Sequence, residues 1–338
     1  MKRTLQILIA AAMLLCTSPA AFAQEAGPKI PAYWSVSGFI NSQYSYVPSQ
    51  TSTFFIRHAR LDLKGFISDK LEFRLQTEFS GNVRLVDAHV KCKFHKCFNV
   101  EVGQFKTPFT LESQYSLLKK EGIDYAQVIS KLSGYSDILP GNRTNGRDIG
   151  VMVYGSLLES EPGGYPLLSY NVGVFNGSGI NRKDDNLGKD IIARLDIHPF
   201  VKDLVLSASM IRGTYAEAAN SEAANNRFSF GGEYKSDVLT VRSEYVRADV
   251  EAGGALSTID GFYVAAGYWL PFVSGFRLRP ILRYDSMTSA GSPFVLYMAG
   301  LDCWPWGNLR LQTCYTLCTD GTFAAPSHLL QAMVSVKF

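Results

Sequence analysis

The chain has 338 residues, of which 46% are hydrophobic and 19% are charged. Its formal net charge of +3 excludes a strongly basic protein that binds nucleic acid. No run of eighteen apolar residues occurs after residue 23, so a bundle of membrane-spanning helices is not expected.

The first residues have the pattern of an export signal. Two basic residues precede an apolar run from Ile7 to Leu15, and the small-x-small sequence Ala21-Phe22-Ala23 follows. We predict a signal peptide over residues 1–23 and a short periplasmic segment over residues 24–35. An exported chain of this apolarity is either a large soluble β protein or a membrane barrel.

The remaining residues, 36–338, alternate between apolar and polar side chains in segments of about ten residues, the length that a tilted strand needs to cross a bilayer. The sixteen predicted segments are Val36–Tyr46, Phe54–Ile67, Lys70–Phe79, Arg84–Phe94, Cys97–Lys106, Asp148–Gly155, Leu167–Asn176, Asp190–His198, Asp203–Arg212, Arg227–Lys235, Asp237–Arg247, Ile259–Trp269, Gly275–Ser286, Pro293–Cys303, Asn308–Cys318 and Leu329–Phe338.

Charged side chains fall on one face of these segments. In the second segment, Arg60 and Lys64 lie on one face and Leu61 and Leu63 on the other. Water inside a barrel and lipid outside would require this separation. The basic residues that the alternation places on the wet face are Arg60, Lys64, Arg74, Lys91, Arg277, Arg279 and Arg283. Asp62, Glu72, Glu78 and Glu101 share that face.

The connections also alternate in length. Links after even-numbered segments are mostly tight, with 156–166 as an exception, whereas 177–189, 213–226 and 248–258 after odd-numbered segments are longer. Outer-membrane barrels have short periplasmic turns and long outer loops. The fold class that we predict is all-β, a transmembrane antiparallel β-barrel of about 16 strands.

One connection, residues 107–147, is far longer than ordinary loops, and loops of that length are usually functional. It is the third outer loop, and its apolar residues could pack it into the lumen as a constriction. The alternative is a solvated surface loop. The basic residues on or next to it are Lys106, Lys119, Lys120, Lys131, Arg143 and Arg147.

The last segment has the same alternation and ends on Phe338. A strand carries unpaired N–H and C=O groups on both sides, so a closed sheet would satisfy it, although an edge strand of a soluble sandwich has the same pattern. We predict that residues 329–338 pair with Val36–Tyr46 and close the barrel.

Catalytic and metal sites are not expected. The five histidines are scattered, and no two of them share a strand face with a carboxylate. We therefore predict neither an enzyme nor a cofactor. Five cysteines follow the signal, an odd number that leaves no complete disulfide set. They are Cys92, Cys97, Cys303, Cys314 and Cys318, and free thiols are favoured over a Cys92–Cys97 pair.

Short motifs occur along most of the chain. They are FIRHARLDLKG at 55–65, DAHV at 87–90, VGQFKTPF at 102–109 with LES at 111–113, RDIGV at 147–151, GVFNG at 173–177 and ARL at 193–195. In this order they resemble the phosphate-selective porin O and P family, outer-membrane β-barrels that usually form trimers.

The resemblance implies a water-filled channel in the bacterial outer membrane, surrounded by lipid, for passive diffusion of small solutes. It further implies a preference for inorganic anions, a relation to phosphate transport and a homotrimer. Arginines of the wall and lysines of the inward loop line the path in such proteins, and the basic residues named above could fill these roles. Phe338 resembles the terminal aromatic residue that the barrel-assembly machinery recognises.

Two other interpretations remain open. A barrel plugged by its long loop would not conduct, and would act as a surface binding or anchoring protein. A soluble lectin-like sandwich is the more distant alternative.

Overall fold

A computed structural model describes residues 33–139, 144–160, 164–199, 201–218, 221–252, 254–271, 275–289, 292–319 and 328–338. The predicted signal peptide and Arg143 lie outside these residues. Within the described ranges, no helix has both the length and the apolarity needed to cross a membrane.

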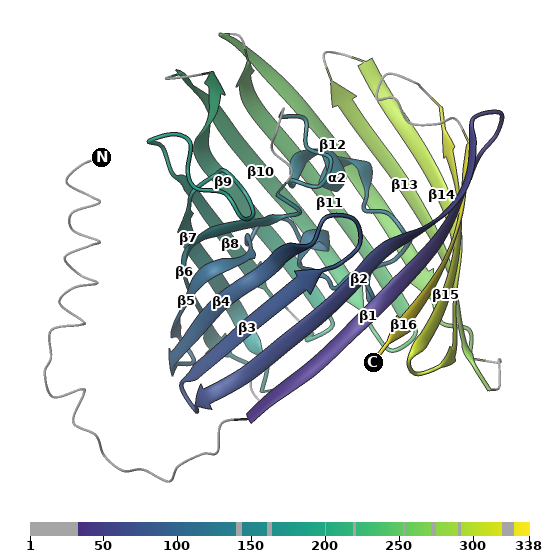
Figure 1. Cartoon of the computed structure of the whole chain (residues 1–338), viewed down its shortest axis with the longest axis horizontal. Coiled ribbons are helices and arrows are strands. Elements are labelled where there is room, and N and C mark those ends of the chain that lie inside the picture. The colour runs from purple at the N-terminus through teal and green to yellow at the C-terminus, as the bar shows by residue number, and fades with distance from the viewer. Residues whose placement is uncertain are drawn as a thin grey trace, which may run out of the picture. The chain divides into compact units, whose positions relative to one another are not determined.

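The described residues form sixteen antiparallel strands in one closed barrel, in which each strand pairs with its neighbours in sequence (Figure 1). The predicted fold class is confirmed, and each of the sixteen predicted segments overlaps one strand. The strands are β1 (Tyr33–Val47), β2 (Thr51–Ser68), β3 (Leu71–Glu78), β4 (Arg84–His95), β5 (Phe98–Lys106), β6 (Arg147–Glu159), β7 (Pro166–Phe175), β8 (Asp190–Ile197), β9 (Leu204–Ala218), β10 (Ser221–Lys235), β11 (Leu239–Ala252), β12 (Ala255–Tyr268), β13 (Arg277–Ser289), β14 (Ser292–Trp306), β15 (Leu309–Cys318) and β16 (His328–Lys337).

The barrel closes where the first and last strands meet, as predicted. β1 and β16 pair from Phe39 opposite Lys337 to Tyr46 opposite Leu330. The last residue continues the pairing, because the Gly38 N–H donates to the Phe338 carbonyl at 2.9 Å and the Phe338 N–H donates back at 3.0 Å. A Cβ on Gly38 would meet the backbone carbonyl of Arg60 and the Phe338 ring, each at 2.6 Å, so glycine fits this close approach of the strands.

The alternation of the sequence becomes the two faces of the wall. In β16, Leu330 and Val334 are each 43% exposed on the outer face, while Gln331 and Ser335 are buried inside. The outer apolar side chains would face lipid, and the buried polar ones face the interior.

Four neighbouring strands are longer than the sequence predicts. The predicted loop 213–226 is mostly part of β9 and β10, and the predicted loop 248–258 is mostly part of β11 and β12. The alanine, glutamate and asparagine residues there have low β propensity, so the sequence alone favours a loop. Cross-strand backbone hydrogen bonds hold these residues in strands instead.

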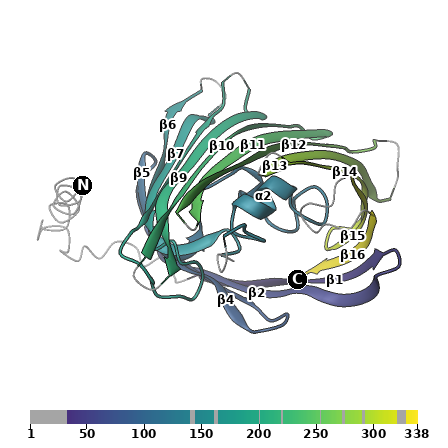
Figure 2. The ribbon, with the colours of Figure 1, turned by 90° about the horizontal axis from the view of Figure 1, so that it is seen from above.

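The long connection between β5 and β6, called the β5–β6 loop below, contains the 3-10 helix η2 (Glu112–Gln114) and the helix α2 (Gln127–Leu132). Figure 2 shows α2 within the ring of strands, and α2 contacts β11, β12 and β13. Buried apolar residues of the loop join inward residues of these strands in one core. Its members include Phe109, Ile123, Val128, Ile129, Leu132, Val246, Ala248, Ile259, Tyr263, Ile281 and Met287.

Candidate functional site

The β5–β6 loop begins with a backbone contact to β11. The Glu244 carboxylate accepts hydrogen bonds from the N–H groups of Leu111 at 2.5 Å and Glu112 at 2.7 Å, and from the Tyr263 hydroxyl at 2.8 Å. Glu244 is 1% exposed. One buried carboxylate therefore satisfies two backbone donors at the start of η2.

Arginines of the wall bind the carbonyl groups of the same loop. Arg310 donates to Leu118 O and Lys120 O, each at 2.9 Å. Arg283 donates to Asp124 O at 2.8 Å. These contacts fix the loop through its backbone, so they do not depend on the loop side chains.

Ion pairs add to these contacts. Glu121 of the loop lies between Arg242 at 2.7 Å and Arg279 at 3.2 Å, and Arg279 also pairs with Asp302 at 2.6 Å. The guanidinium carbon of Arg277 lies 4.1 Å from the centre of the Trp269 ring. The predicted pathway residues Arg277, Arg279 and Arg283 thus hold the loop or stack on the wall.

The opposite side of the loop borders a cavity of about 810 Å³, called the basic cavity below. It lies between the loop and the inner faces of β1, β2 and β3, and it extends from Asn145 to Lys64 and Lys337 near the barrel end where β1 begins. Its basic lining residues are Arg57, Arg60, Lys64, Arg74, Lys106, Lys119, Lys131, Arg147 and Lys337. Its acidic lining residues are Asp62 and Asp124.

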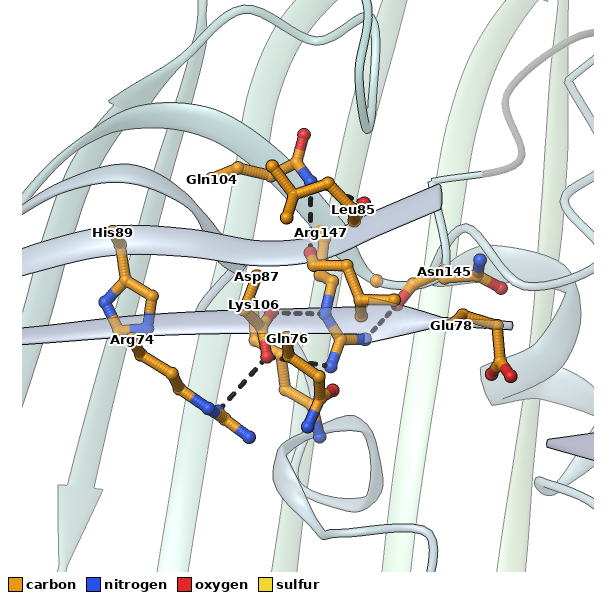
Figure 3. A network of polar contacts seen from close by, with 12 residues as sticks. Arg74, Gln76, Glu78, Leu85, Asp87, His89, Gln104, Lys106, Asn145 and Arg147 are labelled. Atoms are coloured by element: carbon orange, nitrogen blue, oxygen red, sulfur yellow. Dashed lines mark hydrogen bonds and ion pairs between the residues drawn. The ribbon is translucent and has the colours of Figure 1, made fainter. Parts of the chain in front are cut away.

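Arginines along this wall are paired with carboxylates. Arg74 binds both oxygens of Asp62 at 2.9 Å, and it also contacts Asp87 at 3.1 Å. Arg147 reaches the same Asp87 at 2.6 Å, so two arginines share one carboxylate (Figure 3). Arg60 pairs with Glu78 at 2.8 Å.

Three lysines of the basic cavity are less constrained. Among the described residues, Lys119, Lys131 and Lys337 have no ion-pair partner. Lys106 donates to the carbonyls of Ser113 at 2.8 Å and Tyr115 at 2.7 Å. The unpaired lysines therefore supply positive charge that no neighbouring carboxylate neutralises.

Lys120 differs from its neighbour Lys119. Its ammonium donates to Ile123 O at 2.6 Å and lies 4.3 Å from the centre of the Tyr125 ring. It is 2% exposed and does not line the basic cavity. Burial lowers the pKa of Lys120 to about 7, although Glu112 acts in the opposite direction.

A second cavity of about 370 Å³ lies beside the first, along β4 to β8. The two share Arg74, Lys106 and Gln114. Lys91 lines the second cavity, and its ammonium is 3.6 Å from Glu101. The predicted residue Lys91 therefore lies apart from the basic cavity.

Sequence reasoning missed Arg57. The pairing of β1 with β2 passes from Asn41 opposite His58 to Ser42 opposite Ile56, so Arg57 is the extra residue of a β-bulge. Strict alternation from Arg60 places Arg57 outside, whereas the bulge brings it into the basic cavity. The sequence carries no clear signal for this bulge.

The motifs of the sequence meet at the base of the loop. In GQFK, Gly103 has φ of 127°, and a Cβ there would meet the Ala88 carbonyl at 2.2 Å. The Gln104 amide donates to Leu85 O at 3.0 Å. In RDIGV, Asp148 accepts from the Gly177 N–H of GVFNG at 2.6 Å. The motifs thus hold β4 to β7 and the loop ends in place.

Comparison with protein families gives the same assignment. The model of the family "Phosphate-selective porin O and P" matches residues 40–284. The chain belongs to this family. As a member of the porin O and P family, it is a β-barrel channel protein of the bacterial outer membrane. No curated protein sequence matches it.

Several solved outer-membrane proteins have a similar fold. An anion-selective porin from Comamonas acidovorans has a TM-score of 0.69 at 14% identity, with 91% of this chain and 99% of that chain covered. OmpT of Vibrio cholerae, in its trimer form, has a TM-score of 0.65 at 12% identity over 91% and 99%. The outer membrane channel DcaP of Acinetobacter baumannii has a TM-score of 0.64 at 13% identity over 94% and 99%.

Proposed function

We propose that this porin conducts small anions by passive diffusion through the basic cavity. The observation that carries the proposal is the lining, in which nine basic residues accompany two acidic ones. A partly dehydrated anion in a narrow pore needs fixed positive charge and N–H donors in place of lost water. The β5–β6 loop folds into the lumen and narrows it on this side.

Selection among anions is weak in this proposal. Carboxylates of the wall already accept hydrogen bonds from some of the N–H groups of Arg60, Arg74 and Arg147. Lys119 and Lys131 have no ion-pair partner among the described residues, but a lysine offers a point charge instead of a planar pair of donors. Phosphate, which the family description names, would therefore pass as one of several inorganic anions.

The oligomer and the export route belong to the same proposal. We propose a homotrimer, because OmpT of Vibrio cholerae is described in a trimer form and has this fold. Residues 1–23 direct export, and the short periplasmic segment predicted for residues 24–35 ends before Tyr33, where β1 begins. Phe338, which is 60% exposed beside the β1–β16 seam, is available to the barrel-assembly machinery.

Single-channel recording in planar bilayers tests the main claim. In a KCl gradient, we expect open channels whose reversal potential lies toward the chloride equilibrium potential. A reversal potential on the potassium side would contradict anion preference. Absence of conductance, together with no liposome swelling in small solutes, would favour the plugged, non-conducting barrel instead.

Amino-terminal sequencing and mass determination test the other claims. We expect the exported protein to begin at Gln24, and we expect the protein extracted in mild detergent to have three times the mass of one chain. A first residue other than Gln24 would contradict the cleavage site, and the mass of a single chain would contradict the trimer.

A further inference from the structure

The two acidic residues of the basic cavity have different surroundings. Asp62 belongs to the wall, where Arg74 binds both of its oxygens and Lys64 lies at 3.6 Å. Asp124 belongs to the loop and reaches across to the wall. Its Oδ1 accepts from Arg57 of β2 at 2.5 Å, and its Oδ2 accepts from Gln331 of β16 at 2.8 Å. The Asp124 carboxylate thus occupies a pair of donors from two strands.

Both members of the Arg57–Asp124 pair are open to the cavity. The side chain of Arg57 is 25% exposed and that of Asp124 is 37% exposed. Arg57 also donates to Gln43 at 2.7 Å, and its remaining N–H groups have no hydrogen-bond partner among the described residues. A solute in the cavity can therefore reach this guanidinium without first separating the loop from the wall.

The Asp124 carboxylate remains ionised at neutral pH. Burial raises the pKa of Asp124, but Arg57 and Lys120 more than offset this, and the pKa lies below its usual value. Arg57 thus holds a carboxylate in the resting structure.

We propose that Arg57, which lines the basic cavity, and Gln331, which is 5% exposed beneath Asp124, form a binding site for the anionic oxygens of a small carboxylate solute, and that Asp124 is the resident competitor at this site. This inference rests on the proposed anion channel. A CH₂–COO⁻ group already sits on the two donors, so acetate, which has the same chemical group, would replace it with similar contacts. The donors of Arg57 and Gln331 that hold Asp124 are free only when Asp124 has left, so the apparent affinity of this pair of donors for the solute is lowered by the fraction of the protein in which Asp124 has left.

The loop stays in place when the carboxylates exchange. Asp124 keeps its backbone carbonyl on Arg283, and the flanking segment keeps Arg310 on the carbonyls of Leu118 and Lys120. Occupancy of the site by a solute is therefore a side-chain event at the edge of the passage, and the width of the pore changes little.

Inhibition of the chloride current by potassium acetate tests the proposal in single channels. For Asp124→Asn we expect the half-inhibitory acetate concentration to fall by roughly 3- to 10-fold, because the charged competitor is gone while the side-chain volume is kept. Adding Arg57→Gln to this variant should return the half-inhibitory acetate concentration to that of the unmodified protein or above it. Asp62→Asn is the matched control, since it removes one negative charge from the same cavity but leaves Arg57 paired, and its change should be smaller.

Three results would overturn the proposal. One is an unchanged half-inhibitory acetate concentration in Asp124→Asn. Another is an equal fall of this concentration in Asp62→Asn, which would indicate a general charge effect. The third is a rise in conductance with lower anion preference, which would show that Asp124 only fastens the loop. If the unmodified protein does not conduct, the proposed channel fails as well, whereas an anion-preferring protein with any of the three results contradicts the Arg57 site alone.

Discussion

Two walls of the barrel follow the same alternation but meet the β5–β6 loop differently. The inner face of β11 to β13 carries apolar residues such as Val246 and Tyr263 as well as charged ones such as Arg279. The loop covers both kinds. The inner face of β1 to β3 is almost wholly polar, with Arg60 and Arg74 among its residues, and it stays open to the basic cavity.

The difference shows how one lumen is divided. A loop with many apolar side chains is stabilised on an apolar wall, because each Å² of apolar surface removed from water contributes about 25 cal/mol of stability. On the wall of β1 to β3, covering Arg60, Arg74 and their carboxylate partners would cost desolvation, with little apolar surface to offset it. The loop therefore packs on one side, and the basic side stays wet.

The strongest way to break this asymmetry is to release the loop. Glu244→Leu leaves the N–H groups of Leu111 and Glu112 without their buried acceptor, at a cost of about 2–4 kcal/mol. We expect the loop to detach and the single-channel conductance to rise. Limited proteolysis should then cleave within residues 107–139.

A matched control for this variant is Glu159→Leu, which removes an exposed carboxylate that pairs with Lys96 at 3.0 Å. This control should conduct like the unmodified protein. Equal conductance of all three proteins, with a protease-resistant loop in each, would show that Glu244 does not hold the loop.

The next largest effect should come from the unpaired lysines. Lys119→Glu combined with Lys131→Glu reverses two charges of the basic cavity, and we expect the chloride-to-potassium permeability ratio to fall by about threefold or more. Reversal potentials in a KCl gradient measure this permeability ratio. Lys120→Met removes a lysine that does not line this cavity, so its ratio should be unchanged. A similar fall of the permeability ratio in Lys120→Met would contradict the conclusion that Lys120 lies outside the pathway.

A smaller effect is expected when an arginine is replaced by glutamine on each of the two walls. Arg60→Gln removes one charge from the basic cavity and should lower the permeability ratio by about twofold. Arg279→Gln should leave that ratio unchanged but lower the unfolding temperature, because Glu121 and Asp302 each lose one of their buried partners. If both variants changed selectivity equally, the pathway would include the wall of β13.

The sequence predicted the barrel well because period-two alternation is a local signal. Each residue pair such as Arg60 and Leu61 already specifies the wet and the lipid face, and the structure agrees. The same alternation could not separate Arg60 from Arg279, since both lie on the inner face. Which of them lines the pathway depends on where the loop packs, and that is a contact between residues more than a hundred positions apart.

Two further features escaped sequence analysis for related reasons. Arg57 enters the cavity through a bulge, and one extra residue changes the facing of a side chain without changing its type. Lys120 is buried beside the exposed Lys119, and the distant Arg310 binds the carbonyls of Leu118 and Lys120 on either side of Lys119. The apolar inward residues of β11 and β12, such as Val246 and Tyr263, are the signal that could have indicated the covered wall.

The smallest predicted effect concerns pH and the covered side of the loop. The pKa of Lys120 is about 7 in the folded protein, against about 10.4 in an unfolded chain, because burial disfavours the charged form. Between these values the unfolded state binds more protons, so the free energy of unfolding rises with pH. From pH 7 to pH 8 this contribution is about 1 kcal/mol, or about 2 °C in unfolding temperature. Lys120→Met lacks the titrating group, so its unfolding temperature, read from the gel mobility of samples heated stepwise, should fall relative to the unmodified protein as pH rises. Lys119→Met, which alters the exposed neighbour, should keep a constant difference. A constant difference for Lys120→Met as well would show that the Lys120 ammonium stays charged inside the loop.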